Sequence, residues 1–396
     1  MTVDASRLRR IIREVFGRIR DLRRDLHAHP EMAFAEKRTA QKVCEHLKQL
    51  KIPHRTRVGK TGIVALIKGD KPGPCVALRA DMDALPMTET NRFAWRSRKA
   101  GVMHACGHDG HTANLVGVAH VLSRLREHLR GSVKLIFQPA EESGIQGGAE
   151  LMVADGALKD PKVDVIFGLH ISHGVPLGSI SVVAGPALAS ADFFDVRILG
   201  KGAHAAYPHR GIDPIAVAAA AITSLQTIVS RRVDPLQAAV VTVGRINGGT
   251  AHNIIPDEVT FGGTTRSYSP SVRKLLHREV VRIPKDVARA MGAAAEVDFL
   301  ECYPPLINTP KVTGFVQRVA TDAIDAEHVQ EAVPSMGGED FSFYLKTTPG
   351  VFFWLGNGAP ERQIHSGTFN FDDRALRTGM LVMSALALGW ATQSRG

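Results

Sequence analysis

A short polar segment, residues 102–111, concentrates side chains that can bind metal ions or move protons. It reads VMHACGHDGH and holds three histidines, an aspartate and one of the four cysteines of the chain. Taken alone, Cys106 in this segment could be a nucleophile, half of a disulfide, a metal ligand or a small core residue. What the rest of the chain brings to the same place decides between these roles.

Further acidic residues and histidines stand at the ends of apolar runs that predict strands. Asp81 and Asp83 follow CVALRA, Glu141 and Glu142 follow VKLIFQ, His170 ends DVIFGLH, and His365 follows the last apolar strand. Open α/β sheets place their binding sites at the carboxyl ends of strands. Each of these residues alone would more often be a solvated or core residue. Their convergence with Cys106 and His108 at one sheet edge predicts a metal site.

The two acidic pairs have different geometry. Asp81 and Asp83 are two residues apart, so in an extended segment they face the same way. Either both approach the metal, or one of them holds a neighbouring histidine in its ligating tautomer. Glu141 and Glu142 are adjacent and point apart, so one can bind metal while the other acts as general base. Metal-assisted hydrolysis uses that division of labour.

The main chemical alternative is a cysteine nucleophile. His104, His108 and Asp109 are near Cys106 in sequence and could serve as its base and orienting group. That hypothesis leaves the glutamate pair and the two remote histidines without roles, so we favour the metal site. The four cysteines are also scattered too widely for a disulfide framework, which predicts a reducing, cytoplasmic location.

The predicted helices and strands that position these residues follow two different patterns along the chain. Strands predicted over residues 63–67, 75–80, 133–138 and 164–170 alternate with helices, which predicts an α/β domain with a mostly parallel sheet flanked by helices. From about residue 186 the predicted order becomes βαββαβ, the pattern of a ferredoxin-like sandwich. The simplest organisation is a metal-binding domain of residues 1–185 and 305–396, interrupted by an inserted domain of residues 186–304.

The net charge of +10 does not point to nucleic acid. Much of the excess is arginine in the first forty residues, where apolar residues recur at helical spacing, so the arginines should form the exposed face of an amphipathic helix. No nucleic-acid-binding motif is present, and the start of the chain lacks the apolar core of a secretory signal. The most apolar run, residues 216–225, is too short to span a bilayer, so we expect neither nucleic acid nor membrane as a partner.

Nine motifs in order along the chain resemble one enzyme family. The family comprises co-catalytic metallo-exopeptidases and aminoacylases, and the similarity is to its amidohydrolase branch, with hippurate hydrolases, N-acetyl-diaminopimelate deacetylases and plant indole-3-acetyl-amino-acid hydrolases. The motifs are RRDLHAHPE, ALRADMDALP, MHACGHDGHTA, FQPAEE, GLH, GKGAHAAYPHRGIDPI, NIIPDEVTFGGTTRS, SMGGEDFSFY and IHSGTFNFDD. This resemblance implies a zinc-exopeptidase-like fold for the larger domain.

The resemblance also implies roles for the candidate residues. The implied ligands of a two-metal site, usually holding manganese, zinc, cobalt or nickel, are Cys106, His108, Glu142, His170 and His365. Glu141 matches the general base and Asp83 the aspartate that orients a ligand. Relatives outside this branch carry histidine where Asp81 stands and a bridging aspartate near Cys106, which implies that the thiolate takes the bridging role here.

The inserted domain resembles the lid and dimerisation domain of the family, which implies a homodimer or homotetramer. Within it, His204 matches a histidine that steadies the oxyanion, often across the dimer, while Asn253 and Arg266 match residues that contact the substrate. The chain departs from the family at His173 and Gly367, where proline is frequent. These departures affect the shape of the pocket and leave the proposed ligands in place.

The implied reaction is metal-dependent hydrolysis of the amide bond of N-acetyl, N-benzoyl or aryl-acyl amino acids. A dipeptidase or carboxypeptidase with the same two-metal centre is the alternative within the enzyme class. A metal-bound sensor or carrier of acylated amino acids is the alternative outside it. The presence of Glu141 beside the full ligand set favours an enzyme.

Overall fold

The computed structural model describes residues 4–358 and 363–390, and the chain divides into two compact units. The larger unit comprises Met1–Ala187, Ile307–Pro334 and Asp340–Gly396, and the smaller unit comprises Leu188–Leu306 and Ser335–Glu339. Residues 335–339 lie within the range predicted for the larger domain but belong to the smaller unit. In the structure this short segment pairs with the smaller unit, where Leu188 and Ser335 form an isolated bridge.

The larger unit is built on an eight-stranded sheet within the described residues. Its order is β1 (His54–Val58), β2 (Gly62–Lys68), β4 (Arg130–Gln138), β3 (Lys71–Asp81), β5 (Val165–Ser172), β16 (Gly350–Gly356), β6 (Ile180–Val182) and β15 (Val329–Glu331). The central strands β4, β3, β5 and β16 run parallel, as the alternation of strands and helices predicts. Antiparallel pairing appears toward the two sides, between β1, β2 and β4 and between β16 and β6.

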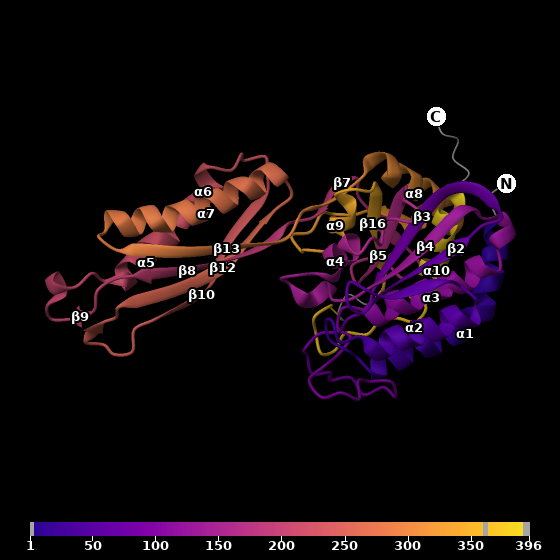
Figure 1. The fold of residues 1–396 in the computed structure, drawn as a ribbon, viewed down its shortest axis with the longest axis horizontal. Helices are drawn as coiled ribbons and strands as arrows, with labels where there is room; N and C mark the ends of the chain where they lie inside the picture. The colour runs from indigo at the N-terminus through magenta and orange to yellow at the C-terminus, as the bar shows by residue number, and fades with distance from the viewer. Residues whose placement is uncertain (1–3, 359–362, 391–396) are drawn as a thin grey trace. The chain divides into compact units, whose positions relative to one another are not determined.

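Helices cover both faces of this sheet (Figure 1). Successive side chains of a strand point to opposite faces, so adjacent residues of β5 identify the two layers. The Phe167 ring packs on Phe315 of α8 (Pro310–Ile324) and on Trp390 of α10 (Ala375–Trp390). On the opposite face, a Cβ at Gly168 would lie 2.8 Å from the ring of Phe341, next to α9 (Ser342–Leu345). The parallel strands are therefore buried on both sides.

The amphipathic helix expected at the start of the chain is α1 (Ala5–Ala28). Its buried residues include Leu8, Ile11, Val15, Ile19, Leu22 and Leu26, while most of its arginines lie outside. The helix packs on α3 (His108–Ser123) and α10, so its apolar stripe extends the core beyond the first helical layer. Arg23 is the exception, because it is fully buried and pairs with Asp109 at 2.9 Å.

The smaller unit has the predicted βαββαβ order. Its antiparallel sheet runs in the order β10 (Ala239–Gly248), β12 (Glu258–Ser267), β8 (Ala191–Leu199) and β13 (Ala294–Tyr303). Helices α5 (Pro214–Leu225), α6 (Thr227–Arg231) and α7 (Pro270–Ala290) contact this sheet, and Val217, Ala221 and Leu225 join its core. This sheet order is that of a ferredoxin-like sandwich.

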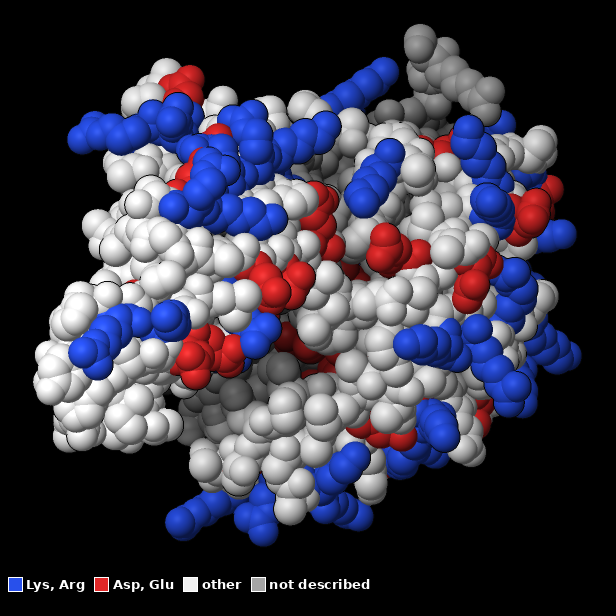
Figure 2. All heavy atoms as spheres, turned by 60° about the vertical axis from the view of Figure 1, so that its left-hand side comes forward, with Lys and Arg blue, Asp and Glu red and all other residues white. Residues whose placement is uncertain are grey.

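Two helical surfaces of the smaller unit are chemically distinct. The outer face of α7 carries Lys274, Arg278, Arg282, Lys285 and Arg289, and basic side chains gather densely there (Figure 2). The run Pro214–Arg231, with a mean hydropathy of 1.2, is by length and composition apolar enough to cross a membrane. Core helices of folded domains meet the same test, and this run contributes the α5 residues named above to the core of its unit.

Candidate metal centre

The carboxyl ends of three neighbouring parallel strands bring most of the predicted site residues together. Asp81 is the last residue of β3, His170 lies near the end of β5, and β4 ends three residues before Glu141. Ala140 has a φ of 54°, a left-handed conformation that turns the chain sharply after β4. Glu141 and Glu142 consequently form a short 3₁₀ turn directly above the sheet edge.

The loop before α3 supplies two further groups. Gly107 has a φ of 87°, and a Cβ there would lie 2.6 Å from the side chain of Ile171, so only glycine fits this turn. The turn separates Cys106 from His108, which is the first residue of α3. Both side chains are buried and face the strand ends.

His365 joins the cluster from the last third of the chain. Its φ of 57° is left-handed, and its backbone N–H donates a hydrogen bond of 2.8 Å to the carbonyl of Ala105. Its Nε2 lies 3.0 Å from Oε1 of Glu142. The loop that carries Cys106 therefore also fixes the histidine that sequence reasoning placed after the last strand.

The potential ligand atoms form overlapping groups, each with its atoms within 4.8 Å of one another. These groups are Cys106 with His108 and His170, Cys106 with Glu142 and His365, and His108 with Glu141 and Glu142. Cys106 belongs to both of the first two groups, and its Sγ lies 3.2 Å from Nε2 of His170. All five predicted ligands and the predicted base thus lie in one cluster.

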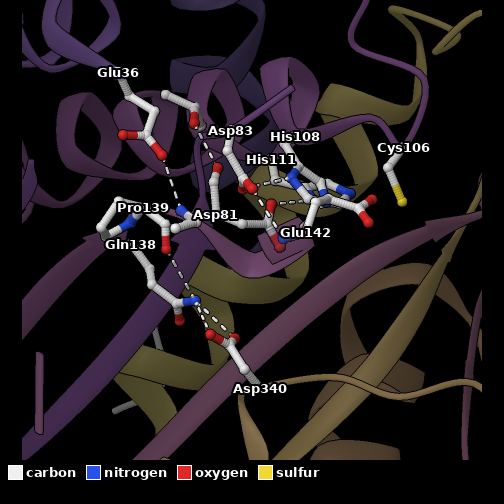
Figure 3. A network of polar contacts seen from close by, with 12 residues as sticks. Glu36, Asp81, Asp83, Cys106, His108, His111, Gln138, Pro139, Glu142 and Asp340 are labelled. Atoms are coloured by element: carbon white, nitrogen blue, oxygen red, sulfur yellow. Dashed lines mark hydrogen bonds and ion pairs between the residues drawn. The ribbon is translucent and has the colours of Figure 1, made fainter. Parts of the chain in front are cut away.

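Asp83 holds two members of this cluster at once (Figure 3). Its Oδ1 lies 3.1 Å from Nδ1 of His108, and its Oδ2 accepts a hydrogen bond of 2.9 Å from the backbone N–H of Glu142. The first contact orients the ring so that Nε2 of His108 points into the cluster. That nitrogen is buried and has no hydrogen-bond partner among the described residues, as expected of an atom kept for a metal.

Asp81 supports the cluster in a different way. Its Oδ1 lies 2.6 Å from Nδ1 of His111, whose Nε2 accepts a hydrogen bond of 2.9 Å from the backbone N–H of Ile171. Asp81, His108 and His111 also lie close enough to hold a cation. Since both ring nitrogens of His111 already have partners, we interpret it as a supporting residue. His104 is buried and belongs to none of the ligand groups found among the described residues.

A buried ion network that was not predicted from the sequence lies next to the site. Arg79 contacts Asp81 at 2.6 Å and Asp340 at 3.0 Å, and all three side chains are inaccessible to solvent. Gln138 donates hydrogen bonds to Asp340, which joins the end of β4 to the segment before α9 (Figure 3). An arginine inside the apolar run CVALRA was a usable signal, because a buried guanidinium requires acidic partners.

Glu36 is a second residue that the sequence analysis missed. It is fully buried, and its Oε1 accepts a hydrogen bond of 2.9 Å from the backbone N–H of Ala140. This contact holds the turn that presents Glu141. Burial raises the pKa of the Glu36 carboxyl to about 7.

The charges around the cluster favour a cation. Burial lowers the pKa of His108, but the neighbouring Asp81 and Asp83 carboxylates outweigh burial and raise it to about 10. Burial and then the glutamate pair raise the pKa of the Cys106 thiol well above its usual range. A thiolate here therefore requires a positive partner, which a divalent metal would supply. Sulfur, imidazole and carboxylate donors fit a zinc-like or related transition-metal ion.

The predicted substrate residues occupy two separate places within the smaller unit. His204 in β9 (Ala203–His204) pairs with Ile254 in β11 (Ile254–Ile255), next to Asn253, and both His204 and Asn253 are exposed. Arg266 lies near the far end of β12, about 26 Å along the strand from its start by the usual rise per residue. Burial lowers the pKa of Arg266, and the Asp192 carboxylate partly offsets this. The structure thus brings His204 and Asn253 together but leaves Arg266 separate.

Several known proteins are similar to this chain in sequence. Residues 77–389 match the model of peptidase family M20/M25/M40. The chain is 41% identical over 355 residues to N-acetyl-L-cysteine deacetylase of Bacillus subtilis, covering 90% of this chain and 84% of the relative. It is 38% identical over 394 residues to thermostable carboxypeptidase 2 of Saccharolobus solfataricus, covering 98% and 99%.

A solved structure is also similar to this chain. The chain aligns with a Bacillus subtilis protein described as a dinuclear metal binding peptidase from the M20 family, with a TM-score of 0.85 and 35% identity. The alignment covers 96% of this chain and 99% of that protein. The family predicted from the ordered motifs is therefore confirmed: the chain is a hydrolase that belongs to peptidase family M20/M25/M40.

Proposed function

We propose that this protein hydrolyses the amide bond of N-acyl amino acids, releasing a carboxylic acid and a free amino acid. The observation that carries the proposal is the position of Glu141, a buried carboxylate within 4.8 Å of the His108 and Glu142 ligand atoms. Relatives named as N-acyl amino acid amidohydrolase and N-acetyl-L-cysteine deacetylase support the same substrate class.

The two ligand groups that contain Cys106 would hold divalent metal ions, and the Cys106 thiolate belongs to both groups. Bound in this site, such ions would polarise the scissile carbonyl and lower the pKa of the attacking water. Manganese, zinc, cobalt and nickel are the candidates. Cys106→Ser should lower metal affinity, whereas Cys44→Ser, in the same unit but outside the site, should not. Retention of both metals with loss of a covalent acyl intermediate would instead favour the nucleophile hypothesis.

The residues of the chain then have separate tasks. Glu141 removes a proton from the attacking water and later delivers it to the departing amine. Asp83 keeps His108 and Glu142 in position during both steps, because it contacts each of them directly. This division explains why a second carboxylate must stand beside the ligating one.

The smaller unit would supply the substrate contacts. We assign Arg266 to the free carboxylate of the substrate, because a guanidinium pairs with it through two parallel hydrogen bonds. We assign His204 to the oxyanion, with Asn253 beside it contacting the substrate backbone. The exposure of His204 and its separation from Arg266 favour action in a partner subunit of a homodimer or homotetramer.

Co-expression of two inactive variants tests this arrangement. His204→Ala and Glu141→Gln subunits should each be inactive alone but recover activity in mixed dimers if His204 acts across subunits. Light scattering during size-exclusion chromatography measures the oligomeric state of each sample. No recovery in demonstrably mixed dimers would place His204 in its own subunit.

A dipeptidase or carboxypeptidase activity is the second candidate, favoured by the similarity to thermostable carboxypeptidase 2. A substrate panel separates the two functions. Metal-stripped protein is reloaded with manganese, zinc, cobalt or nickel and assayed with N-acetyl, N-benzoyl and dipeptide substrates. Faster release from N-acyl amino acids supports the proposal, and a preference for dipeptides overturns it.

A further inference from the structure

A cavity of about 430 Å³ lies in the larger unit away from the metal centre. It is bounded by the first half of α1, the end of α8 and the start of α10. Its floor is apolar and includes the buried side chains of Ile12, Ile324 and Leu381. Its volume is within the range of small-molecule pockets, and none of its lining residues belongs to the metal centre.

The length of α1 separates this cavity from the metal centre. Arg9 lines the cavity, while His27 near the other end of the helix contacts Asp109, the neighbour of His108, at 2.8 Å. The helical rise puts Arg9 and His27 about 27 Å apart. The cavity is therefore an independent site within the same unit.

Three arginines give the rim of the cavity a strong positive charge. Arg9 donates a hydrogen bond of 2.7 Å to the carbonyl of Ala323, and the Arg377 guanidinium stacks 4.1 Å from the centre of the Phe16 ring. Neither Arg13 nor Arg377 has a carboxylate partner among the described residues, in contrast to the paired arginines elsewhere on α1. Unpaired guanidinium groups beside a cavity suit a carboxylate ligand.

Asp325 adds a single opposite charge to this rim. Its φ of 70° and ψ of 154° lie in a backbone region that is almost restricted to glycine. Within the described residues its side chain makes no hydrogen bond or ion pair. No contact of the carboxylate therefore explains why an aspartate, rather than a glycine, has this backbone conformation. Strained residues of this kind cluster at ligand sites, where the carboxylate would face a bound cation.

We propose that this cavity binds a free amino acid with an apolar side chain. Arg13 and Arg377 would pair with its carboxylate, Asp325 with its ammonium group, and the apolar floor would take its side chain. A simple carboxylic acid would satisfy the arginines and leave Asp325 without a partner. The proposal concerns binding alone and stands whether or not the metal centre performs the proposed hydrolysis.

Isothermal titration calorimetry of the full-length protein tests the proposal. Because free amino acids are also products of the proposed reaction, the titrations use both metal-loaded and metal-stripped protein. The probes are L-leucine, 4-methylpentanoate, which lacks the amine, and 3-methylbutylamine, which lacks the carboxylate. We expect leucine to bind in both states, the acid to bind at least about tenfold more weakly, and the amine not to bind.

Variants test whether leucine binds in this cavity. Arg13→Ser with Arg377→Ser should abolish leucine binding to the stripped protein, and the matched pair Arg10→Ser with Arg318→Ser, exposed and outside the cavity, should not. Asp325→Asn should lower the affinity for leucine to that for 4-methylpentanoate and leave the affinity for 4-methylpentanoate unchanged. This variant tests the proposal even if the double arginine variant fails to fold. Equal affinity for leucine and the acid in the natural protein, or leucine binding unchanged by Asp325→Asn, would overturn the proposal.

Discussion

The metal centre of the larger unit and the His204–Asn253 pair of the smaller unit are supported in opposite ways. Around the metal centre, buried carboxylates hold ligands through contacts such as Asp83 to His108 at 3.1 Å. His204 and Asn253 are exposed on a two-stranded ribbon. The side chains of the metal centre are therefore held in position by buried partners. On the ribbon, the exposed His204 side chain only accepts a hydrogen bond from the nearby backbone N–H of Ala206.

Stability and activity should be coupled around the metal centre and independent of each other on the ribbon. Removing a buried charge beneath the metal centre leaves its partners unpaired in a dry environment and so destabilises the fold. Removing the exposed His204 side chain frees only the backbone N–H of Ala206, which is itself exposed and can bond to water. Substitutions of the buried charges should therefore lower both stability and activity. Substitutions on the ribbon should lower activity alone.

The largest effect on stability is expected from Arg79→Leu. It leaves the buried carboxylates of Asp81 and Asp340 without their arginine partner. The free energy of unfolding, measured by urea denaturation, should fall by about 3–5 kcal/mol. Arg124→Leu removes an exposed ion pair with Glu14 and should cost at most about 1 kcal/mol. Similar costs for both variants would contradict the view that the buried network supports the site.

His204→Ala is expected to lower kcat by about 10²–10³-fold if His204 steadies the oxyanion. The free energy of unfolding should change by less than about 0.5 kcal/mol, because the side chain is exposed. His209→Ala, in the same exposed region, is the control for activity. A large loss of stability in the His204 variant would break the contrast between the two regions.

Glu36 provides a test by pH. Its pKa of about 7 in the folded protein exceeds the ordinary glutamate value of 4.5. Its protonated form therefore stabilises the fold below about pH 4.5, and this contribution is lost as the pH rises through 7. The natural protein should therefore lose up to about 3 kcal/mol over that interval relative to Glu36→Gln. Parallel stability curves for the two proteins would show that this carboxyl titrates normally.

Asp83→Asn has the smallest expected effect among these variants. The amide keeps the shape but weakens the orientation of His108, so metal affinity or activity should fall about 10–100-fold. Metal titration with a competing chelator measures the affinity. An unchanged affinity together with unchanged activity would remove Asp83 from the site.

The strands and the ligand cluster were predictable because each apolar run ends in residues that a parallel sheet must gather at one edge. The prediction over residues 75–80 corresponds to β3, and the end of that strand correctly placed Asp81. Arg79 was present in the same run, but its partner Asp340 comes from a segment 261 residues away, which no local pattern connects to it. Glu36 was missed for the same reason, because its contact with Ala140 depends on packing across 104 residues.

In the proposed mechanism Glu141 acts as the general base beside an intact metal site. Glu141→Gln should lower kcat by at least about 100-fold while the metal content per subunit, measured by inductively coupled plasma mass spectrometry, stays that of the natural protein. Glu150→Gln, an exposed glutamate of α4 (Gly148–Ala154), is the matched control and should keep full activity. Full activity in the Glu141 variant with metal bound would contradict the account.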